Sequence, residues 1–243
     1  MSGQFNRLLV DQGNTSIKYC LADNQGRLSD VQVVTSAQEI PTEGILHVRV
    51  ASVKSNEDAR KLISALSYQV KDCQRLLTSA EAFGVQCAYQ NYQSLGVDRW
   101  LAVLAAASIT GNACAVVDYG TANTVDFLSA QQNTGARQHL GGWIAPGVKT
   151  MRSALVNRTA NVFDDDKFPL ELEIGDSTES CVAHGCLANL YGMLHIAQEN
   201  LRKITANGKI FLTGGHAKGI NLSAFPNIEF REKLVFEGLN RFI

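Results

Sequence analysis

The chain has 243 residues, of which 45% are apolar and 19% are charged, and its formal net charge is -1 at pH 7. This length and composition allow a large buried core, in one domain or in two of about 110 to 130 residues. The balanced charge gives no reason to expect nucleic acid or an anionic membrane as a partner, because both require a concentrated basic surface. Any anionic ligand must therefore be held by a local arrangement of donors.

The cysteines and the apolar segments indicate a cytoplasmic protein. The six cysteines form no CxxC pair, and the first ten residues lack the long apolar region of a secretory signal. Reduced thiols are expected, because cytosolic proteins rarely keep disulfides. The longest apolar run, residues 100–109, is about half the length needed to cross a bilayer and predicts a buried helix.

The chain opens with short apolar segments separated by turns. Residues 7–10 form an apolar run that ends in a turn at 11–14, and residues 17–21 then alternate between apolar and polar side chains. This pattern predicts a strand, a tight turn and a second strand. A further turn at 23–26 leads into a third strand at 31–34, so an antiparallel meander is expected.

A strand and two helices complete the first half. Residues 45–53 alternate as a strand, and a capping-box pattern at 55–58 opens a helix. A less regular stretch reaches Gly96, after which a second helix is expected to begin at Asp98 and to contain the apolar run 100–109.

The second half restarts the same pattern. Apolar residues 115–117 end in a turn at 118–121, and a returning strand follows at 125–128. The turn Val-Asp-x-Gly thus occurs at corresponding places in the two halves, which is typical of an internal duplication. We expect two lobes, residues 1–111 and residues 112–243.

Further elements are expected in the second lobe. They are a strand at 139–144, a helix at 147–156, a long helix at 179–204, and a short strand at 210–212 that a glycine turn at 213–215 stops.

Three strand ends in this chain lead into glycine turns. Glycine lets backbone N–H groups approach a phosphate, and a strand-end Asp can orient a cation. A single DxG is an ordinary turn, because Asp and Gly are default turn residues. Two such turns at matched places, each followed by hydroxyl or amide donors, indicate a clamp for a triphosphate. The chain has neither GxxxxGK[ST] nor a GxGxxG after a strand, which excludes the P-loop and dinucleotide-binding patterns.

Four ordered motifs resemble one family. In chain order, Asp11-Gln12-Gly13-Asn14-Thr15-Ser16-Ile17-Lys18, Gly96-Val97-Asp98-Arg99, Asp118-Tyr119-Gly120-Thr121-Ala122 and Gly141-Gly142-Trp143-Ile144-Ala145-Pro146-Gly147 are similar to the DxGNTxxK, GxDR, DxGTA and GGxIxPG motifs of type III pantothenate kinases. The resemblance extends to residues 175–178 and 213–215 and covers nearly the whole chain. Gln12 departs from it, because an aliphatic residue is expected there.

The resemblance implies a fold and an activity. The fold is α/β, with two ribonuclease H-like lobes of the actin-like ATPase class in which helices flank mixed sheets. The activity is phosphorylation of the primary alcohol of pantothenate by ATP, the opening step of coenzyme A synthesis. Asp98, the Asp of GxDR, becomes the candidate general base. A helix N-cap is its alternative role, and the two are compatible because a cap leaves one carboxylate oxygen available.

The resemblance also implies ATP with Mg²⁺, and K⁺ or NH₄⁺, as cofactors. Asp11 would hold Mg²⁺ through water molecules, because Mg²⁺ gives up its hydration reluctantly. Asp118 would help to coordinate the monovalent cation. Lys18 could reach a phosphate or be solvated. The ATP-binding residues would be Asp11, Gln12, Gly13, Asn14, Thr15, Ser16, Ile17, Lys18 and Thr121.

The acceptor site and the assembly are implied in the same way. Arg99 would face the pantothenate carboxylate or an ATP phosphate with its forked donors, and a surface ion pair is its alternative. The match of Tyr92 rests on spacing alone and leaves a packed aromatic open, as a helix cap stays open for Thr178. A homodimer is expected, in which the partner completes the pantothenate pocket. The substrate-binding residues would be Tyr92, Gly96, Val97, Asp98, Arg99 and Thr178.

Two other functions remain open. One is an actin-like phosphotransferase that acts on a sugar or acetate, and GxDR argues against it. The other is a regulator that binds a nucleotide without transferring phosphate. Asp11, Asp98 and Asp118 argue against the regulator, because a chain that only binds could lose them.

Overall fold

The computed structural model describes residues 5–68, 70, 72–156, 169 and 171–243, which divide into two compact units. The first unit runs to Ile109 and also contains Lys233–Ile243, and the second unit is Thr110–Glu232. The chain therefore leaves the first unit close to the expected boundary at Gly111. The C-terminal segment differs from the expected lobe 112–243, because it returns to the first unit and packs its apolar helix there.

A mixed sheet of five strands forms the centre of the first unit, in the order β3-β2-β1-β4-β5. β2 is antiparallel to both β1 and β3, whereas β4 lies parallel to β1 and β5 lies parallel to β4. The strands are β1 (Arg7–Gln12), β2 (Ile17–Ala22), β3 (Gln32–Val34), β4 (His47–Ser52) and β5 (Asp72–Arg75).

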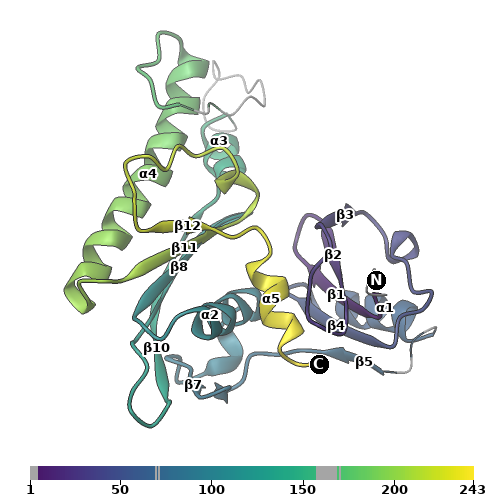
Figure 1. Ribbon diagram of the computed structural model, residues 1–243. Helices are drawn as coiled ribbons and strands as arrows, with labels where there is room; N and C mark the ends of the chain where they lie inside the picture. Colours follow the sequence, from purple (N-terminus) through teal and green to yellow (C-terminus); the bar gives the residue numbers. More distant parts are fainter. Residues whose placement is uncertain (1–4, 69, 71, 157–168, 170) are drawn as a thin grey trace. The chain divides into compact units, whose positions relative to one another are not determined.

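Helices cover both faces of this sheet (Figure 1). α1 (Asn56–Ser67) joins β4 to β5, and its buried leucines share a core with Val10 and Val50. Because side chains alternate along a strand, Leu9 points to the opposite face. There α2 (Val97–Ile109) and α5 (Leu234–Asn240) pack against each other and against the central strands.

The second unit repeats the sheet of the first. Its strands follow the order β12-β11-β8-β9-β10, with β9 antiparallel to β8 and β10, β11 parallel to β8, and β12 parallel to β11. β8 to β12 thus take the places of β1 to β5 one by one, which confirms the predicted duplication. The strands are β8 (Cys114–Tyr119), β9 (Ala122–Leu128), β10 (Arg137–Pro146), β11 (Lys209–Thr213) and β12 (Ile228–Phe230).

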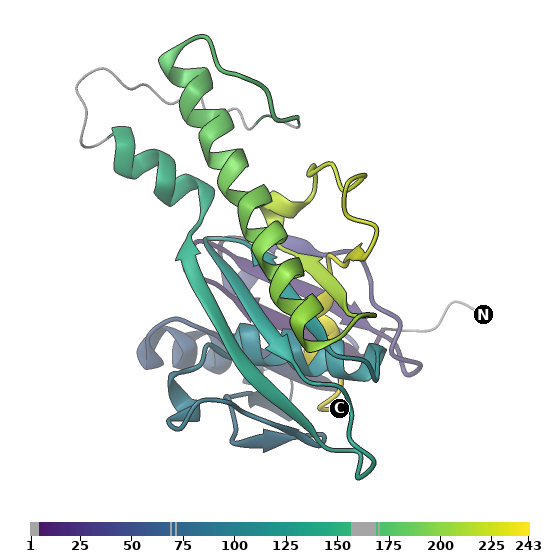
Figure 2. The ribbon, with the colours of Figure 1, turned by 90° about the vertical axis from the view of Figure 1, so that its left-hand side faces the viewer.

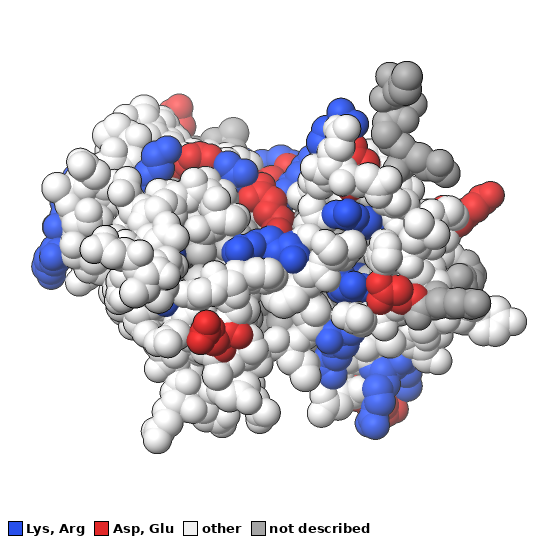
Figure 3. Space-filling model, turned by 60° about the horizontal axis from the view of Figure 1, so that its bottom comes forward, with Lys and Arg blue, Asp and Glu red and all other residues white. Residues whose placement is uncertain are grey.

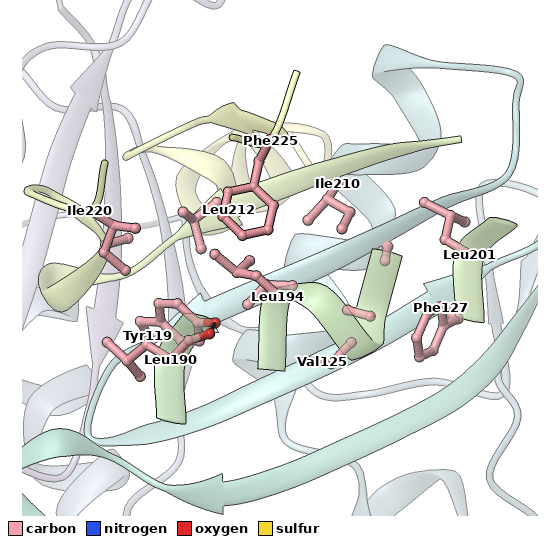
Figure 4. Packing of buried hydrophobic residues seen from close by; sticks show 14 of the residues in the cluster. Tyr119, Val125, Phe127, Leu190, Leu194, Leu201, Ile210, Leu212, Ile220 and Phe225 are labelled. Atoms are coloured by element: carbon pink, nitrogen blue, oxygen red, sulfur yellow. Dashed lines mark hydrogen bonds between the residues drawn. The ribbon is translucent and has the colours of Figure 1, made fainter. Parts of the chain in front are cut away.

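A long helix supplies one side of the core of the second unit. α3 (Val148–Val156) follows β10, and α4 (Thr178–Ile204) runs across the strands (Figure 2). Its leucines interlock with side chains of β8, β9 and β11, as Figure 4 shows. The buried hydroxyl of Tyr119 donates to the carbonyl of Leu190 over 2.6 Å and so ties β8 to the middle of α4.

Most of the predicted elements are confirmed, and the additions are short. α2 begins at Val97, one residue before its expected start. The irregular stretch before it contains β5 and a hairpin of β6 (Glu81–Ala82) and β7 (Val85–Gln86). β5 reads DCQR, and its side chains do not alternate between apolar and polar, so no strand signal stands out.

The face of the molecule drawn in Figure 3 has no large patch of one charge. Lys and Arg side chains there lie among Asp and Glu side chains, and most of the face is uncharged. Among the helices that the structure describes, none is long and apolar enough to cross a membrane.

Candidate active site

The first candidate element is the turn between β1 and β2. The amide of Gly13 donates to the carbonyl of Ser16 over 3.1 Å and closes the turn. Asn14 and Thr15 lie exposed at its tip. The turn can therefore offer backbone and hydroxyl donors to an anion in solution.

The strand register sets the side chains beside this turn. Asp11 stands directly opposite Lys18 in the antiparallel pair, so both side chains lie on one face of the sheet. Gln12 points to the other face, where it is buried and its Oε1 accepts a hydrogen bond of 2.7 Å from Ser52. The unexpected polarity of Gln12 thus has a structural cause, because its amide ties the end of β1 to the end of β4.

The second element is the start of α2. The amide of Trp100 donates to the carbonyl of Gly96, which makes Gly96 the capping residue and places Asp98 inside the first turn. Asp98 is therefore not the N-cap. Its Oδ1 accepts a hydrogen bond of 2.8 Å from the amide of Arg99. A Cβ at Gly96 would stand only 2.5 Å from this oxygen, so a glycine is required for the carboxylate to fold back over the helix start.

Arg99 lies inside the first unit rather than on its surface. Its side chain is only 7% exposed, which rules out a surface ion pair. Nη1 donates to the hydroxyl of Tyr89 over 3.2 Å, and the guanidinium carbon lies 6.0 Å from the centre of the Tyr89 ring. A buried guanidinium held in this way has a fixed orientation.

The third element is the turn after β8 in the second unit. The amide of Gly120 donates to the carbonyl of Ala122 over 3.1 Å. Gly214, at a φ of 97°, lies so close that a Cβ there would stand 2.3 Å from Oδ1 of Asp118. The glycine turn after β11 thus packs directly on the Asp118 carboxylate.

Backbone oxygens gather beside the same turn. A Cβ at Gly147 would lie 2.3 Å from the carbonyl oxygen of Thr121 and 2.5 Å from that of Gly120. The side-chain amide of Asn123, which is buried, donates to the carbonyl of Pro146 over 3.0 Å and joins β9 to the end of β10. The absence of a side chain at Gly147 therefore leaves space beside the carbonyl oxygens of Gly120 and Thr121.

Thr178 lines a cavity of about 720 Å³ in the second unit. Ser177 is the N-cap of α4, since its side chain accepts from the amide of Ser180, and Thr178 is the first helical residue. The cap alternative for Thr178 is therefore wrong. Met151 and Leu155 of α3 form another wall of the cavity, and apolar surface predominates in it.

The predicted residues fall into three local groups. Those from Asp11 to Lys18 share the first turn, those from Gly96 to Arg99 share the start of α2, and Asp118 and Thr121 share the turn of the second unit. Tyr92 lies half-buried in a short 3-10 turn before α2. Sequence reasoning missed Tyr89, because the chain from Cys87 to Asn91 has no period that would tell which of the two tyrosines meets Arg99.

The oxygen donors suit the two expected cations. Among the described residues, no group of three or more His, Cys, Asp and Glu side chains could hold a metal ion by itself. Mg²⁺ that arrives with a nucleotide needs only one or two carboxylates besides phosphate and water, which Asp11 can satisfy. The Asp118 carboxylate and the carbonyls beside Gly147 are hard oxygen ligands of the kind that an alkali cation takes.

Comparison with known sequences identifies close relatives. The chain matches a family model described as type III pantothenate kinase over residues 7–199. A protein of Pseudoalteromonas atlantica with that name is 36% identical over 251 residues, covering 100% of this chain and 99% of the relative. One from Pseudoalteromonas translucida is 34% identical and covers 96% of this chain and 94% of the relative.

Solved structures share the fold at lower identity. A conserved Campylobacter jejuni protein assigned to the Baf family of transcriptional activators superposes with a TM-score of 0.62 at 20% identity, over 97% of this chain and 96% of that one. MreB 5 of Spiroplasma citri bound to AMPPNP gives a TM-score of 0.52 at 10% identity, over 97% and 95%. These likenesses confirm the two-lobed actin-like architecture.

Proposed function

Because the chain belongs to the type III pantothenate kinase family, we propose that it transfers the γ-phosphoryl group of ATP to the primary hydroxyl of pantothenate. The product would be 4'-phosphopantothenate, and the reaction would open coenzyme A synthesis. The observation that supports the proposal is the start of α2, where the Asp98 carboxylate accepts a hydrogen bond from the backbone amide of Arg99 and the buried Arg99 guanidinium contacts Tyr89.

Asp98 acts as the general base in this proposal. Phosphoryl transfer to an alcohol needs a carboxylate that orients the hydroxyl and accepts its proton as the bond to phosphorus forms. The hydrogen bond from Arg99 and the absence of a side chain at Gly96 hold the Asp98 carboxylate in one orientation. A fixed carboxylate lowers the entropic cost of aligning the alcohol with the γ-phosphorus.

The two repeated turns hold the nucleotide. Backbone amides of Asn14, Thr15 and Ser16 and the Lys18 ammonium bind phosphate oxygens in the first unit, Gly13 lets the turn close, and the Thr121 hydroxyl donates to phosphate in the second. Asp11 would hold Mg²⁺ through water, and the ion would supply charge neutralisation on the phosphates. The exposure of Asn14, Thr15 and Thr121 supports this assignment.

A monovalent cation belongs to the second turn. Asp118 and the carbonyl oxygens of Gly120 and Thr121 are the residues that would hold K⁺ or NH₄⁺ there. Such a cation would supply positive charge to the nucleotide site. Gly214 and Gly147 leave the space in which these oxygens can converge.

Pantothenate, the acceptor, is bound through its own carboxylate and through the polar groups of its chain. Arg99 pairs with the pantothenate carboxylate through two parallel N–H donors, and Tyr89 fixes the guanidinium plane. Thr178 donates its hydroxyl from the wall of the cavity, and Tyr92, Gly96 and Val97 line the approach to Asp98. A homodimer completes this pocket, and sedimentation of the purified protein at twice the 26.4 kDa of one chain would support that assembly.

A coupled assay of ADP release tests the function. The purified protein is mixed with ATP, Mg²⁺ and K⁺, and pantothenate is compared with a sugar acid, with acetate and with no acceptor. Pantothenate-dependent ADP release supports the proposal. ADP release with only the sugar acid or acetate would show that the chain is a different phosphotransferase. Nucleotide binding without ADP release would indicate a regulator that transfers no phosphate.

A further inference from the structure

The C-terminal segment is fastened to the sheet of the first unit. The side-chain amide of Asn240 donates to the carbonyl of Gly26 over 3.2 Å, and the Arg49 Nε donates to the carbonyl of Phe242 over 3.0 Å. Arg49 in turn pairs with Asp72 on β5. The end of α5 and the residues after it therefore have a fixed place relative to the strands.

The same segment contacts the helix that carries Asp98. A Cβ at Gly238 would stand 2.2 Å from the carbonyl oxygen of Leu101, so the backbones of α5 and α2 touch directly at this point. One turn further along α2, Nη1 of Arg241 donates to the carbonyl of Leu104. Arg241 is half-buried, and its partial burial lowers the pKa of its guanidinium.

Arg241 also covers the turn between β6 and β7. Its guanidinium carbon lies 4.0 Å from the centre of the Phe83 ring, and this ring packs edge-on against Phe242 at 4.8 Å. A cation this close to an aromatic face is attracted electrostatically by the ring. The guanidinium thus joins the β6–β7 turn to α2.

The backbone conformation of the β6–β7 turn is unusual for an aromatic residue. Phe83 has a φ of 50° and Gly84 a φ of 77°, the left-handed pair that a two-residue hairpin requires. Glycine or asparagine is the ordinary choice at such a position, and a bulky residue is strained there. The contacts of the Phe83 ring with Arg241 and Phe242 offset this strain.

The turn leads straight to the partner of Arg99. The hairpin pairs Ala82 with Val85, and a further hydrogen bond of 2.9 Å runs from the amide of Cys87 to the carbonyl of Ala80. Tyr89 follows shortly after, with its hydroxyl on Arg99. The hairpin is therefore joined to α2 at two places, through Arg241 near its turn and through Tyr89 beyond its second strand.

We propose that Arg241 is a positioning residue for the acceptor site: it clamps the Phe83 turn onto α2 and thereby fixes Tyr89 against Arg99. This inference rests on the proposed function, in which Arg99 binds the pantothenate carboxylate. Loss of the clamp would leave the Arg99 guanidinium with more orientations, so binding of the acceptor would weaken while the nucleotide turns stay unchanged.

The test compares Arg241→Met, Arg241→Lys and Leu62→Val with the wild type. Leu62 lies in the α1 core on the other face of the sheet, so its substitution lowers stability without touching the clamp. We expect Arg241→Met to raise KM for pantothenate about 10-fold with little change in KM for ATP. Arg241→Lys, which keeps a cation over the ring, should recover most of this loss, and Leu62→Val should leave both KM values unchanged.

Hydrogen exchange gives a readout that needs no activity. Amides of residues 81–89 should exchange faster in Arg241→Met than in Leu62→Val. If the wild type fails to phosphorylate pantothenate, the proposed function is wrong, and the clamp is then judged on this exchange alone. Unchanged exchange in Arg241→Met would overturn the clamp, and so would an unchanged KM for pantothenate in an active enzyme.

Discussion

The Asp98 carboxylate is oriented by its immediate neighbours in the chain. The Arg99 amide donates to it, and Gly96 leaves the space that it occupies. The GxDR pattern thus has a local structural explanation. Gly96 precedes the helix and leaves space for the Asp98 carboxylate, and the Arg99 side chain is buried. The resemblance of GxDR predicted which residues to consider here, and the contacts of the Asp98 carboxylate with the Arg99 amide and with the space at Gly96 lie within one helical turn.

The partner of Arg99 could not be predicted in the same way. Tyr89 reaches Arg99 through the fold of an irregular segment, whereas the only tyrosine that spacing predicted near the site was Tyr92, as a contact of pantothenate. A substitution separates the two tyrosines. Tyr89→Phe should raise KM for pantothenate about 3- to 10-fold, because the guanidinium loses one hydrogen-bond acceptor. Tyr68→Phe is the matched control, since this side chain is 91% exposed. An effect of Tyr92→Phe alone would contradict the assignment.

Asp118 is tested through the monovalent cation. Asp118→Asn keeps the size of the side chain beside Gly214 and removes its negative charge. We expect the K⁺ concentration for half-maximal activity to rise by about 10-fold or more, because a neutral amide is a weaker ligand for a hard cation. The assay titrates K⁺ at saturating ATP and pantothenate. Wild-type activity that is unaffected by removing every monovalent cation would rule out this role.

At the scale of elements, the glycine turn after β11 packs closely against the Asp118 carboxylate at the end of β8. Gly214→Ala should lower the free energy of unfolding by about 2 to 3 kcal/mol, because its φ of 97° and the adjacent Asp118 oxygen both exclude a methyl group. A Cβ at the adjacent Gly215 would meet no other atom within 4 Å, so Gly215→Ala should change that energy by less than about 0.5 kcal/mol. Urea denaturation measures both, and equal losses would contradict the packing described.

The junction of β4 and β5 makes the first unit sensitive to acid. His47 and Arg49 both bind the Asp72 carboxylate and hold its pKa below its ordinary value. A lowered folded pKa contributes stability above the unfolded pKa of about 4, and this contribution disappears as the pH falls through the folded pKa. Asp72→Asn should therefore be less stable than the wild type at pH 6 and nearly equal to it below pH 3. A constant difference across this range, measured by urea denaturation, would show that the charge is irrelevant.

The predicted elements agree best with the structure where a single local sequence signal, such as a helix cap or an apolar run, dominates. The helix at Ser55 followed from its cap, and Asp58 indeed shares a hydrogen bond with that serine. α2 followed from its unbroken apolar run. The β6–β7 hairpin was missed because its turn holds Phe83 where glycine or asparagine would mark a turn, and only the packing of that ring by the C-terminal segment makes it favourable.

For the whole molecule, the repeated sheet is the feature that sequence predicted best. The same strand order and directions recur in both units, and each unit places a Val-Asp-x-Gly turn between its first two strands. The units differ in what is inserted: α3 and α4 lie between β10 and β11, whereas only a short 3-10 turn lies between β3 and β4. The return of α5 to the first unit was out of reach, because its apolar face could have packed on either unit.

We propose that the two duties of the molecule are separate: the repeated turns hold ATP, and Asp98, outside the repeat, accepts the proton of the acceptor hydroxyl. Asp98→Asn is the most direct test, with Asp58→Asn at the first turn of α1 as its control. We measure the affinity for a non-hydrolysable ATP analogue and the single-turnover rate of pantothenate phosphorylation. Asp98→Asn should bind the analogue as the wild type does and lose the rate by about 100- to 10,000-fold. Transfer at the wild-type rate, or loss of nucleotide binding instead, would contradict the account.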